Sequence, residues 1–176
     1  MATNRIERLL DPAFVEGLRD LPMEEVRAKR AECAEVEVGL SMLRRVVQGR
    51  LDIVGSDLQR RAGGEPADLG ALVDQLPEIL SDHQRPPGMG RLPTLLVPSE
   101  IDDLTAEVDA LADPRRLSSL PDMDEAEVRS LADALGELER RTSDQRRLLL
   151  DRLDALQEEI VRRYKAGEAN VDSLLK

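Results

Sequence analysis

Five polar side chains of complementary chemistry recur at helical spacing in the first half of the chain. They are an acid, a hydroxyl, a base, an amide and a second acid: Glu37, Ser41, Arg44, Gln48 and Asp52. At about 100° per residue, spacings of four, three, four and four place all five within roughly 80° of arc on one helix. The stripe offers both hydrogen-bond donors and acceptors, which is what a site for a polar ligand requires.

An apolar stripe lies about 100° from the polar one on the same predicted helix. Its residues step mostly by three and four positions, the spacing of a coiled-coil seam: Cys33, Val36, Leu40, Leu43, Val47, Leu51, Val54 and Leu58. We interpret Cys33 as a buried small hydrophobe of this seam. Three glycines interrupt the helix, each at a cost of up to about 1 kcal/mol relative to Ala, and we interpret them as places where a ligand or a partner helix comes close: Gly39, Gly49 and Gly55.

Both stripes return 102 residues later. The repeated polar stripe consists of Glu139, Ser143, Arg146 and Asp154, with Leu150 where the pattern has Gln. Repetition of seam and polar stripe together indicates the duplication of a helical unit. If the two helices pair in antiparallel fashion along their seams, the polar stripes lie side by side and present a site of approximate two-fold symmetry. The natural occupant of such a site is a two-fold-symmetric ligand.

The composition predicts an all-α protein of one domain. Of the 176 residues, 35% are charged and only 1% are aromatic, which excludes most sandwiches and barrels and favours long helices. The predicted fold is an antiparallel coiled coil of two long helices, with additional short helices in the connector and the N-terminal arm. The predicted segments are an N-terminal arm with a short helix at 1–20, the first motif-bearing helix at 21–62, the connector at 63–121, the second motif-bearing helix at 122–166 and a tail at 167–176.

Turn and capping residues predict where these helices begin and end. The first long helix starts with Pro22 in its first turn and ends at Gly63-Gly64. Asp11-Pro12 forms an N-cap and first-turn pair in the arm. In the connector, a helix is predicted around Pro77, and a second helix starts at Ser99-Glu100 and stops before Pro114. The last helix is predicted to open at Asp122 in a capping box with Glu125 and to run to about Lys165.

Several classes of function are excluded or disfavoured. The only Cys is Cys33 and the only His is His83, so no metal site is expected. No nucleophile stands beside a base, and catalysis is therefore not expected. A net charge of −11 argues against broad nucleic-acid binding, because phosphates would be repelled. The chain has no apolar run of membrane-spanning length and no signal peptide, and a cytoplasmic location is expected.

The acidic surplus is concentrated between Glu100 and Glu127. This stretch holds only two bases, Arg115 and Arg116, against ten acids: Glu100, Asp102, Asp103, Glu107, Asp109, Asp113, Asp122, Asp124, Glu125 and Glu127. Two interpretations remain open. The acids either form a solvated surface or attract a basic partner.

The spacing Glu-x3-Ser-x2-Arg-x3-Gln-x3-Asp resembles the signature of the RsiG family of actinobacterial anti-sigma factors. At average residue usage, five such residue types at this spacing occur by chance about once per million starting positions. The resemblance covers about residues 20–62 and 120–165, and it leaves out the connector and the termini. In that family two motif-bearing helices form an antiparallel coiled coil that binds an intercalated cyclic di-GMP dimer. The loaded protein then keeps the sporulation sigma factor WhiG from RNA polymerase.

This resemblance implies cyclic di-GMP as ligand and a WhiG-like sigma factor as partner, with no direct contact to DNA. Glu37, Ser41, Arg44, Gln48 and Asp52 would form one half-site. Glu139, Ser143, Arg146 and Asp154 would form the other, in which Leu150 removes one polar contact. The alternative function is that of a structural coiled-coil adaptor, whose polar stripes recognise a partner protein and no nucleotide.

Overall fold

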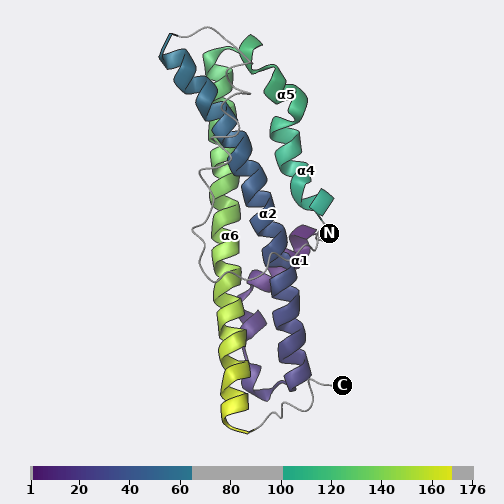
Figure 1. The fold of residues 1–176 in the computed structure, drawn as a ribbon. Coiled ribbons are helices and arrows are strands. Elements are labelled where there is room, and N and C mark those ends of the chain that lie inside the picture. The colour runs from purple at the N-terminus through teal and green to yellow at the C-terminus, as the bar shows by residue number, and fades with distance from the viewer. Residues whose placement is uncertain (1, 65–100, 168–176) are drawn as a thin grey trace.

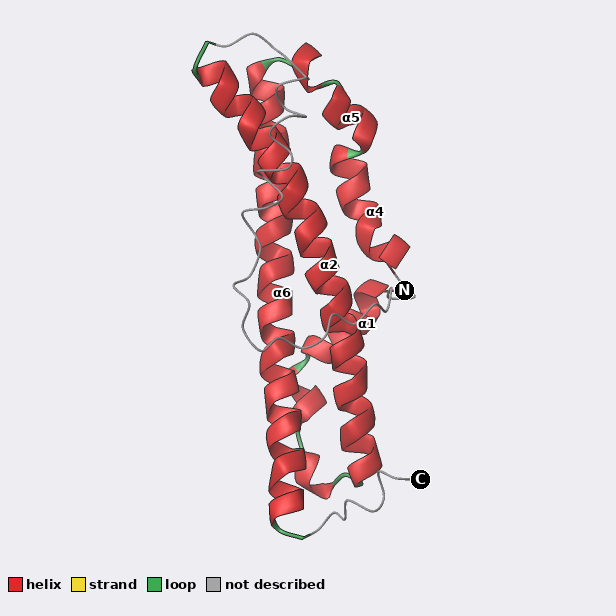
Figure 2. Cartoon of the chain, in the orientation of Figure 1, coloured by secondary structure: helices red, strands yellow, loops and turns green. Residues whose placement is uncertain are grey.

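The computed structural model describes residues 2–64 and 101–167. Within these ranges every regular element is helical (Figures 1 and 2). Two long helices dominate, α2 (Met23–Ala62) and α6 (Glu125–Lys165). They run in opposite directions along the whole length of the molecule (Figure 1). The predicted all-α fold, with two long helices packed against each other, is confirmed.

Short helices cover one side of this pair. Before α2 come α1 (Ala2–Leu10) and two 3-10 turns, η1 (Pro12–Val15) and η2 (Leu18–Asp20). Before α6 come α4 (Ile101–Ala112), α5 (Pro114–Ser118) and the 3-10 turn η3 (Leu120–Asp122). The two sets of short helices follow different halves of the long pair (Figure 1). The coiled coil therefore forms the centre of a helical bundle, and the two sets of short helices together form its third layer.

The first long helix has the predicted boundaries to within one or two residues. Pro22 occupies the N-cap position, with Glu24 and Glu25 in the first turn, where carboxylates favour the positive end of the helix dipole. Gly63 is the C-cap, and Gly64 follows with φ +73°. The arm is also helical, but α1 begins at Ala2, before the predicted Asp11-Pro12 start. That pair caps η1 instead, since the Asp11 carboxylate accepts the Ala13 N–H at 2.8 Å.

The predicted start of the last helix is wrong by two residues, because the N-cap is Asp124 and not Asp122. Asp122 ends η3, and Met123 is extended at ψ 148°, which breaks the helical path after Asp122. The capping box is formed by Asp124 and Glu127, in which Asp124 Oδ1 accepts the Glu127 N–H at 2.8 Å and Glu127 Oε2 accepts the Asp124 N–H at 2.9 Å. The sequence holds two overlapping Asp-x-x-Glu pairs, and the turn preceding them selects the second.

The end of α4 is confirmed, because the helix stops at Ala112 and Asp113 caps α5 at Pro114. The predicted cap at Ser99-Glu100 lies outside the described residues. So do the predicted connector helix around Pro77, His83 and the tail beyond Gly167.

The internal repeat extends beyond the two long helices to which the sequence prediction confined it. A shift of 102 residues superposes α1 on α4, η1 on α5, η2 on η3 and α2 on α6. Asp11 and Asp113 each cap the element that starts at the following proline. Each half of the molecule is thus one arm followed by one long helix, and the halves are related by an approximate two-fold axis across the middle of the coil.

Two apolar clusters fill the bundle, one under each set of short helices. Leu9, Phe14, Cys33, Leu40 and Leu156 belong to the cluster under the N-terminal arm. Val47, Val54, Val108, Leu120 and Leu135 belong to the cluster under α4 and α5. Cys33 has no exposed surface, and burial raises the pKa of its thiol to about 11. Its interpretation as a buried hydrophobe is confirmed.

Each arm is joined to the opposite long helix by an ion pair whose arginine also donates to backbone carbonyls of the arm, and we call these two groups of contacts the clasps. Glu159 accepts the Arg163 Nε–H at 2.7 Å, and Arg163 in turn donates to the Leu18 carbonyl at 2.6 Å. At the other end Asp57 accepts the Arg61 Nε–H at 2.5 Å, and Arg61 donates to the carbonyls of Leu120 and Met123. These residues are related by the same shift of 102. Sequence analysis missed them, although buried acids followed by Arg at the third and fourth positions recur in both helices.

At two of the three glycines within α2, no described part of the protein comes close, so of the predicted approaches only that of a ligand stays a prediction there. A Cβ atom at Gly49 or Gly55 would meet nothing within 4 Å among the described residues. Gly39 is buried in the bundle.

Gly49→Ala is therefore expected to stabilise the protein by about 0.5–1 kcal/mol, because Ala restricts the unfolded chain and is accommodated in the helix. Urea unfolding measures the change. Gly64→Ala is the matched control of opposite sign, since its φ of +73° strains any residue with a Cβ. A destabilised Gly49→Ala variant would contradict the open space seen at this position.

Candidate functional site

The two polar stripes meet on the side of the coil that faces away from the short helices. Arg50 of α2 contacts the covered side, donating to the Val108 carbonyl of α4 at 2.7 Å. Gln48, two residues earlier, points about 160° away from it. On α6, Arg141 reaches Glu107 of α4 at 2.5 Å. Ser143 is turned by the same angle from Arg141, so both stripes lie on the side of the coil opposite the described short helices.

One polar cluster joins Glu37 and Ser41 of α2 to Arg146 of α6. The Arg146 Nε–H lies 2.9 Å from Glu37 Oε1 and 2.7 Å from Ser41 Oγ. The Ser41 hydroxyl donates to Glu37 Oε1 at 2.7 Å, which closes a three-membered network. The Glu37 side chain is 16% exposed and that of Arg146 25%, so this ion pair is partly shielded from water.

The second cluster is built in the same way from the other ends of the stripes. The Arg44 Nε–H lies 3.0 Å from Glu139 Oε1 and 2.8 Å from Ser143 Oγ. The Ser143 hydroxyl donates to Glu139 Oε1 at 2.9 Å. The close agreement of these distances with those of the first cluster shows that the two-fold symmetry holds at the level of side chains.

The clusters differ at one position. Gln48 Nε2 donates to Glu139 Oε1 at 3.1 Å, so Glu139 has three side-chain donors. Leu150 stands at the position related to Gln48 by the repeat, and among the described residues Glu37 accepts from two side chains, Arg146 and Ser41. The amide thus serves here to hold the carboxylate of the opposite helix, and Leu150 leaves the Glu37 cluster with one donor fewer.

The grouping of the residues differs from the one the sequence suggested. Each arginine crosses to the acid and hydroxyl of the other helix, so a cluster combines both motifs instead of presenting one motif alone. Asp52 and Asp154 lie at the ends of the stripes. Within the described residues neither has a hydrogen bond or an ion pair, and the structure does not bring them into the clusters.

The arrangement leaves donors free for a ligand. Only the Nε–H of Arg44 and of Arg146 is bonded among the described residues, and both Nη groups of each guanidinium have no hydrogen bond there. A guanidinium fork matches a pair of acceptors such as guanine O6 and N7, or two phosphate oxygens. The acids can accept the N–H groups of the same base. The site therefore suits a planar anionic ligand that can bridge both helices.

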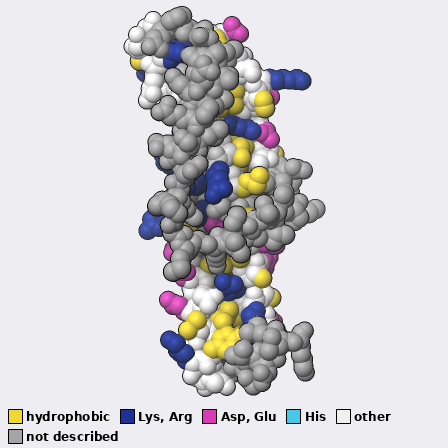
Figure 3. Space-filling model, viewed as in Figure 1, with side chains coloured by type: hydrophobic (Ala, Val, Ile, Leu, Met, Phe, Trp, Pro, Cys, Tyr) yellow, Lys and Arg dark blue, Asp and Glu magenta, His cyan; other side chains and the backbone are white. Residues whose placement is uncertain are grey.

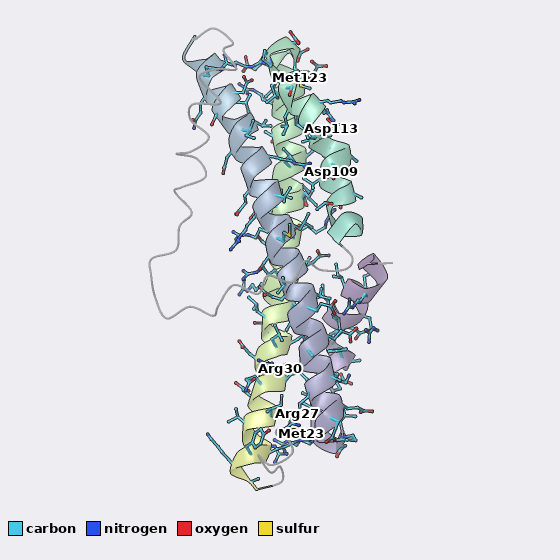
Figure 4. The ribbon with its side chains drawn as sticks, turned by 45° about the vertical axis from the view of Figure 1, so that its right-hand side comes forward. Met23, Arg27, Arg30, Asp109, Asp113 and Met123 are labelled. Carbon is cyan, nitrogen blue, oxygen red and sulfur yellow. The ribbon has the colours of Figure 1, made fainter. Side chains whose placement is uncertain are left out.

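Many of the connector acids have structural partners. Glu107 pairs with Arg141 and Asp109 with Arg50, and Asp113 and Asp124 cap helices. Figure 4 shows Asp109 and Asp113 along the segment formed by α4 and α5. On the face seen in Figure 3, acidic, basic and hydrophobic side chains are interspersed along the molecule. Glu125 pairs with Arg129, and Glu127 completes the capping box of Asp124. Six of the ten acids thus have structural contacts, and the basic partner expected for the acidic stretch remains a hypothesis.

The described residues contain no group of three or more His, Cys, Asp and Glu side chains that could hold a metal ion. Nor does any helix in the described ranges have the length and apolar character needed to span a membrane.

Fold and site together define a duplicated helical protein: an antiparallel coiled coil that carries a two-fold-related pair of Arg-Glu-Ser clusters on the side opposite the described short helices. The RsiG-like family model matches residues 12–80, and this match supports the assignment of the chain to the RsiG-like family, as the motif predicted. The matched range includes the whole polar stripe of α2, while that of α6 lies beyond it. The family suggests an anti-sigma factor role. No curated protein matches the chain.

Proposed function

We propose that the protein is a nucleotide-responsive anti-sigma factor that binds cyclic di-GMP on the side of α2 and α6 opposite the described short helices and sequesters a WhiG-like sigma factor from RNA polymerase. The observation that carries the proposal is the pairing of the two polar stripes into clusters of nearly equal geometry. A two-fold-symmetric ligand can make the same contacts in both. Cyclic di-GMP, bound as a dimer, has this symmetry and supplies guanine edges and phosphodiesters.

Ligand binding in this scheme exchanges partners inside the site. The free Nη groups of Arg44 and Arg146 take guanine O6 and N7 or phosphate oxygens, while Glu37 and Glu139 accept the guanine N1–H and amino groups. Because each cluster combines residues of both helices, a ligand held by a cluster contacts both α2 and α6. The nucleotide therefore acts as an additional cross-link of the coil, and the sigma factor recognises the loaded form. The protein works as a binding switch and performs no chemical step.

One observation favours a second function, that of a structural coiled-coil adaptor without nucleotide. The arginines and acids satisfy one another across the helices, with Nε–O distances of 2.9 Å and 3.0 Å, and such pairs also set the register of an ordinary coiled coil. Capture of the partner protein depends on cyclic di-GMP in the first function and is independent of any nucleotide in the second.

Isothermal titration of cyclic di-GMP into the purified protein, alone and with a candidate WhiG-like sigma factor, tests the proposal. Saturable binding is expected, together with stronger capture of the sigma factor in the presence of the nucleotide. Cyclic di-AMP is the matched control, because adenine offers a donor where guanine offers the O6 acceptor. Absence of heat with cyclic di-GMP in both titrations would exclude the proposed switch and leave the adaptor.

A further inference from the structure

Arg30 is a cation on the site face that the motif does not include. It lies seven residues before Glu37 in α2, which returns it to the same face within about 20°. Within the described residues it has neither a hydrogen bond nor an ion pair, although its Nε atom is buried. Figure 4 shows Arg30 in the lower half of the coil, on the α6 side of α2. An arginine N–H that is buried without an acceptor is costly, by about 1–3 kcal/mol.

The register of the coil places Arg30 beside the cluster that lacks the amide. Arg146 bonds to Glu37 and Ser41, and continuing this antiparallel register toward the start of α2 brings Arg30 level with residues 153–157 of α6. Leu150 lies about one turn, and Arg146 about two turns, before this level in α6. One face of the coil thus carries Arg30, Glu37 and Arg146 in succession.

The other half of the molecule has no such cation. The residue related to Arg30 by the shift of 102 is Ala132, and the residue related to Leu150 is Gln48. Each half therefore has one extra polar group near its cluster, an amide in the Glu139 half and a guanidinium in the Glu37 half. The Glu37 half therefore has Leu150 in place of the amide, and it carries Arg30, a hydrogen-bonding residue of different chemistry, on the same face of the coil.

We propose that Arg30 is a ligand-binding residue of the Leu150 half-site and that it takes a phosphodiester oxygen of the bound dinucleotide. The inference rests on the proposed function. Arg30 lies about 10 Å along the helix from Glu37, so it reaches the ligand beyond the bases held by Arg146 and Glu37. Its side chain has no partner among the described residues and gains a charge-assisted hydrogen bond in the complex. The site is accordingly asymmetric, with an amide supporting one half and a third arginine supporting the other.

Titration of cyclic di-GMP into Arg30→Ala tests the assignment. The expected result is a loss of affinity of about tenfold or more, the value of a hydrogen bond to a charged group, with an unchanged or slightly raised melting temperature. Arg45→Ala is the matched control, because Arg45 is an exposed arginine of the same helix without a partner in the described structure, and its affinity should stay within about twofold. Arg30→Lys keeps the charge without the fork and should fall between wild type and Arg30→Ala.

Wild-type affinity in Arg30→Ala, or equal losses in Arg30→Ala and Arg45→Ala, would overturn the inference and leave the proposed function intact. A wild-type protein that binds no cyclic di-GMP would overturn both.

Discussion

Replacement of both Arg44 and Arg146 by alanine is expected to lower the affinity for cyclic di-GMP by about a hundredfold or more, since each bidentate contact to guanine contributes about 1–3 kcal/mol. The two guanidinium groups hold the only Nη donors of the clusters. Their loss also leaves Glu37 and Glu139 without their cationic partners. Isothermal titration gives the affinity, and thermal unfolding of the same samples shows that the variant is folded.

The repeat offers a closely matched control for this experiment. Arg45 and Arg147 are the next residues on the same helices, and both are exposed. The Arg45→Ala, Arg147→Ala variant has the same change in net charge but keeps the clusters, and its affinity should stay close to that of wild type. If the two double variants behave alike, the arginines act only through overall charge. If the cluster variant alters sigma-factor binding alone, the adaptor function is correct.

Removal of the Glu159 carboxylate is expected to produce the largest loss of stability. The Arg163 side chain is only 7% exposed. In Glu159→Ala it loses its carboxylate partner and keeps only its hydrogen bonds to backbone carbonyls. Uncompensated buried charges of this kind cost about 3 kcal/mol or more. For a protein of this size the melting temperature should fall by about 6–12 °C. Glu158→Ala is the control, since Glu158 is an exposed neighbour that lacks a partner in the described part of the chain.

The same variant predicts how stability depends on pH. Hydrogen bonds from Arg162, and then from Arg163, lower the pKa of Glu159 from its ordinary 4.5 to about 2. A carboxyl whose pKa is depressed on folding stabilises the protein above its unfolded pKa, and this contribution is lost as the pH falls through the folded value. The stability difference between wild type and Glu159→Ala should therefore be constant above about pH 5 and shrink between about pH 4.5 and pH 2. If the stability difference does not change with pH over this window, Glu159 does not form its ion pairs with Arg162 and Arg163 in the folded protein.

The clasps explain how a long thin coil holds its site in register. Asp57 with Arg61, and Glu159 with Arg163, tie the far ends of α2 and α6 to the turns η3 and η2. The Arg-Glu-Ser clusters lie midway between these ends. Sliding of one helix along the other would break the clasps and the clusters together, so the two half-sites are held at a set separation. A ligand that bridges both halves benefits from this rigidity, because less order has to be imposed on binding.

Much of the fold was predictable because it depends on local rules. The three- and four-residue steps of the seam define the long helices, and Pro22, Gly63 and Pro114 define helix ends through backbone chemistry that needs no distant partner. The predictions failed where two local signals competed. Asp122 and Asp124 both start an Asp-x-x-Glu pair, and only the extended Met123 selects the second as the cap.

The sequence by itself determined which residues form the polar stripes, that the stripes are repeated, and that Leu150 breaks the repeat, because helical periodicity follows directly from residue spacing. Only the tertiary structure decided how the stripes combine. Arg44 joins Glu139 and Arg146 joins Glu37 because the antiparallel register brings residues about a hundred positions apart to the same level. The structure also decided that Arg30 has no partner among the described residues, since this depends on what the opposite helix places beside it.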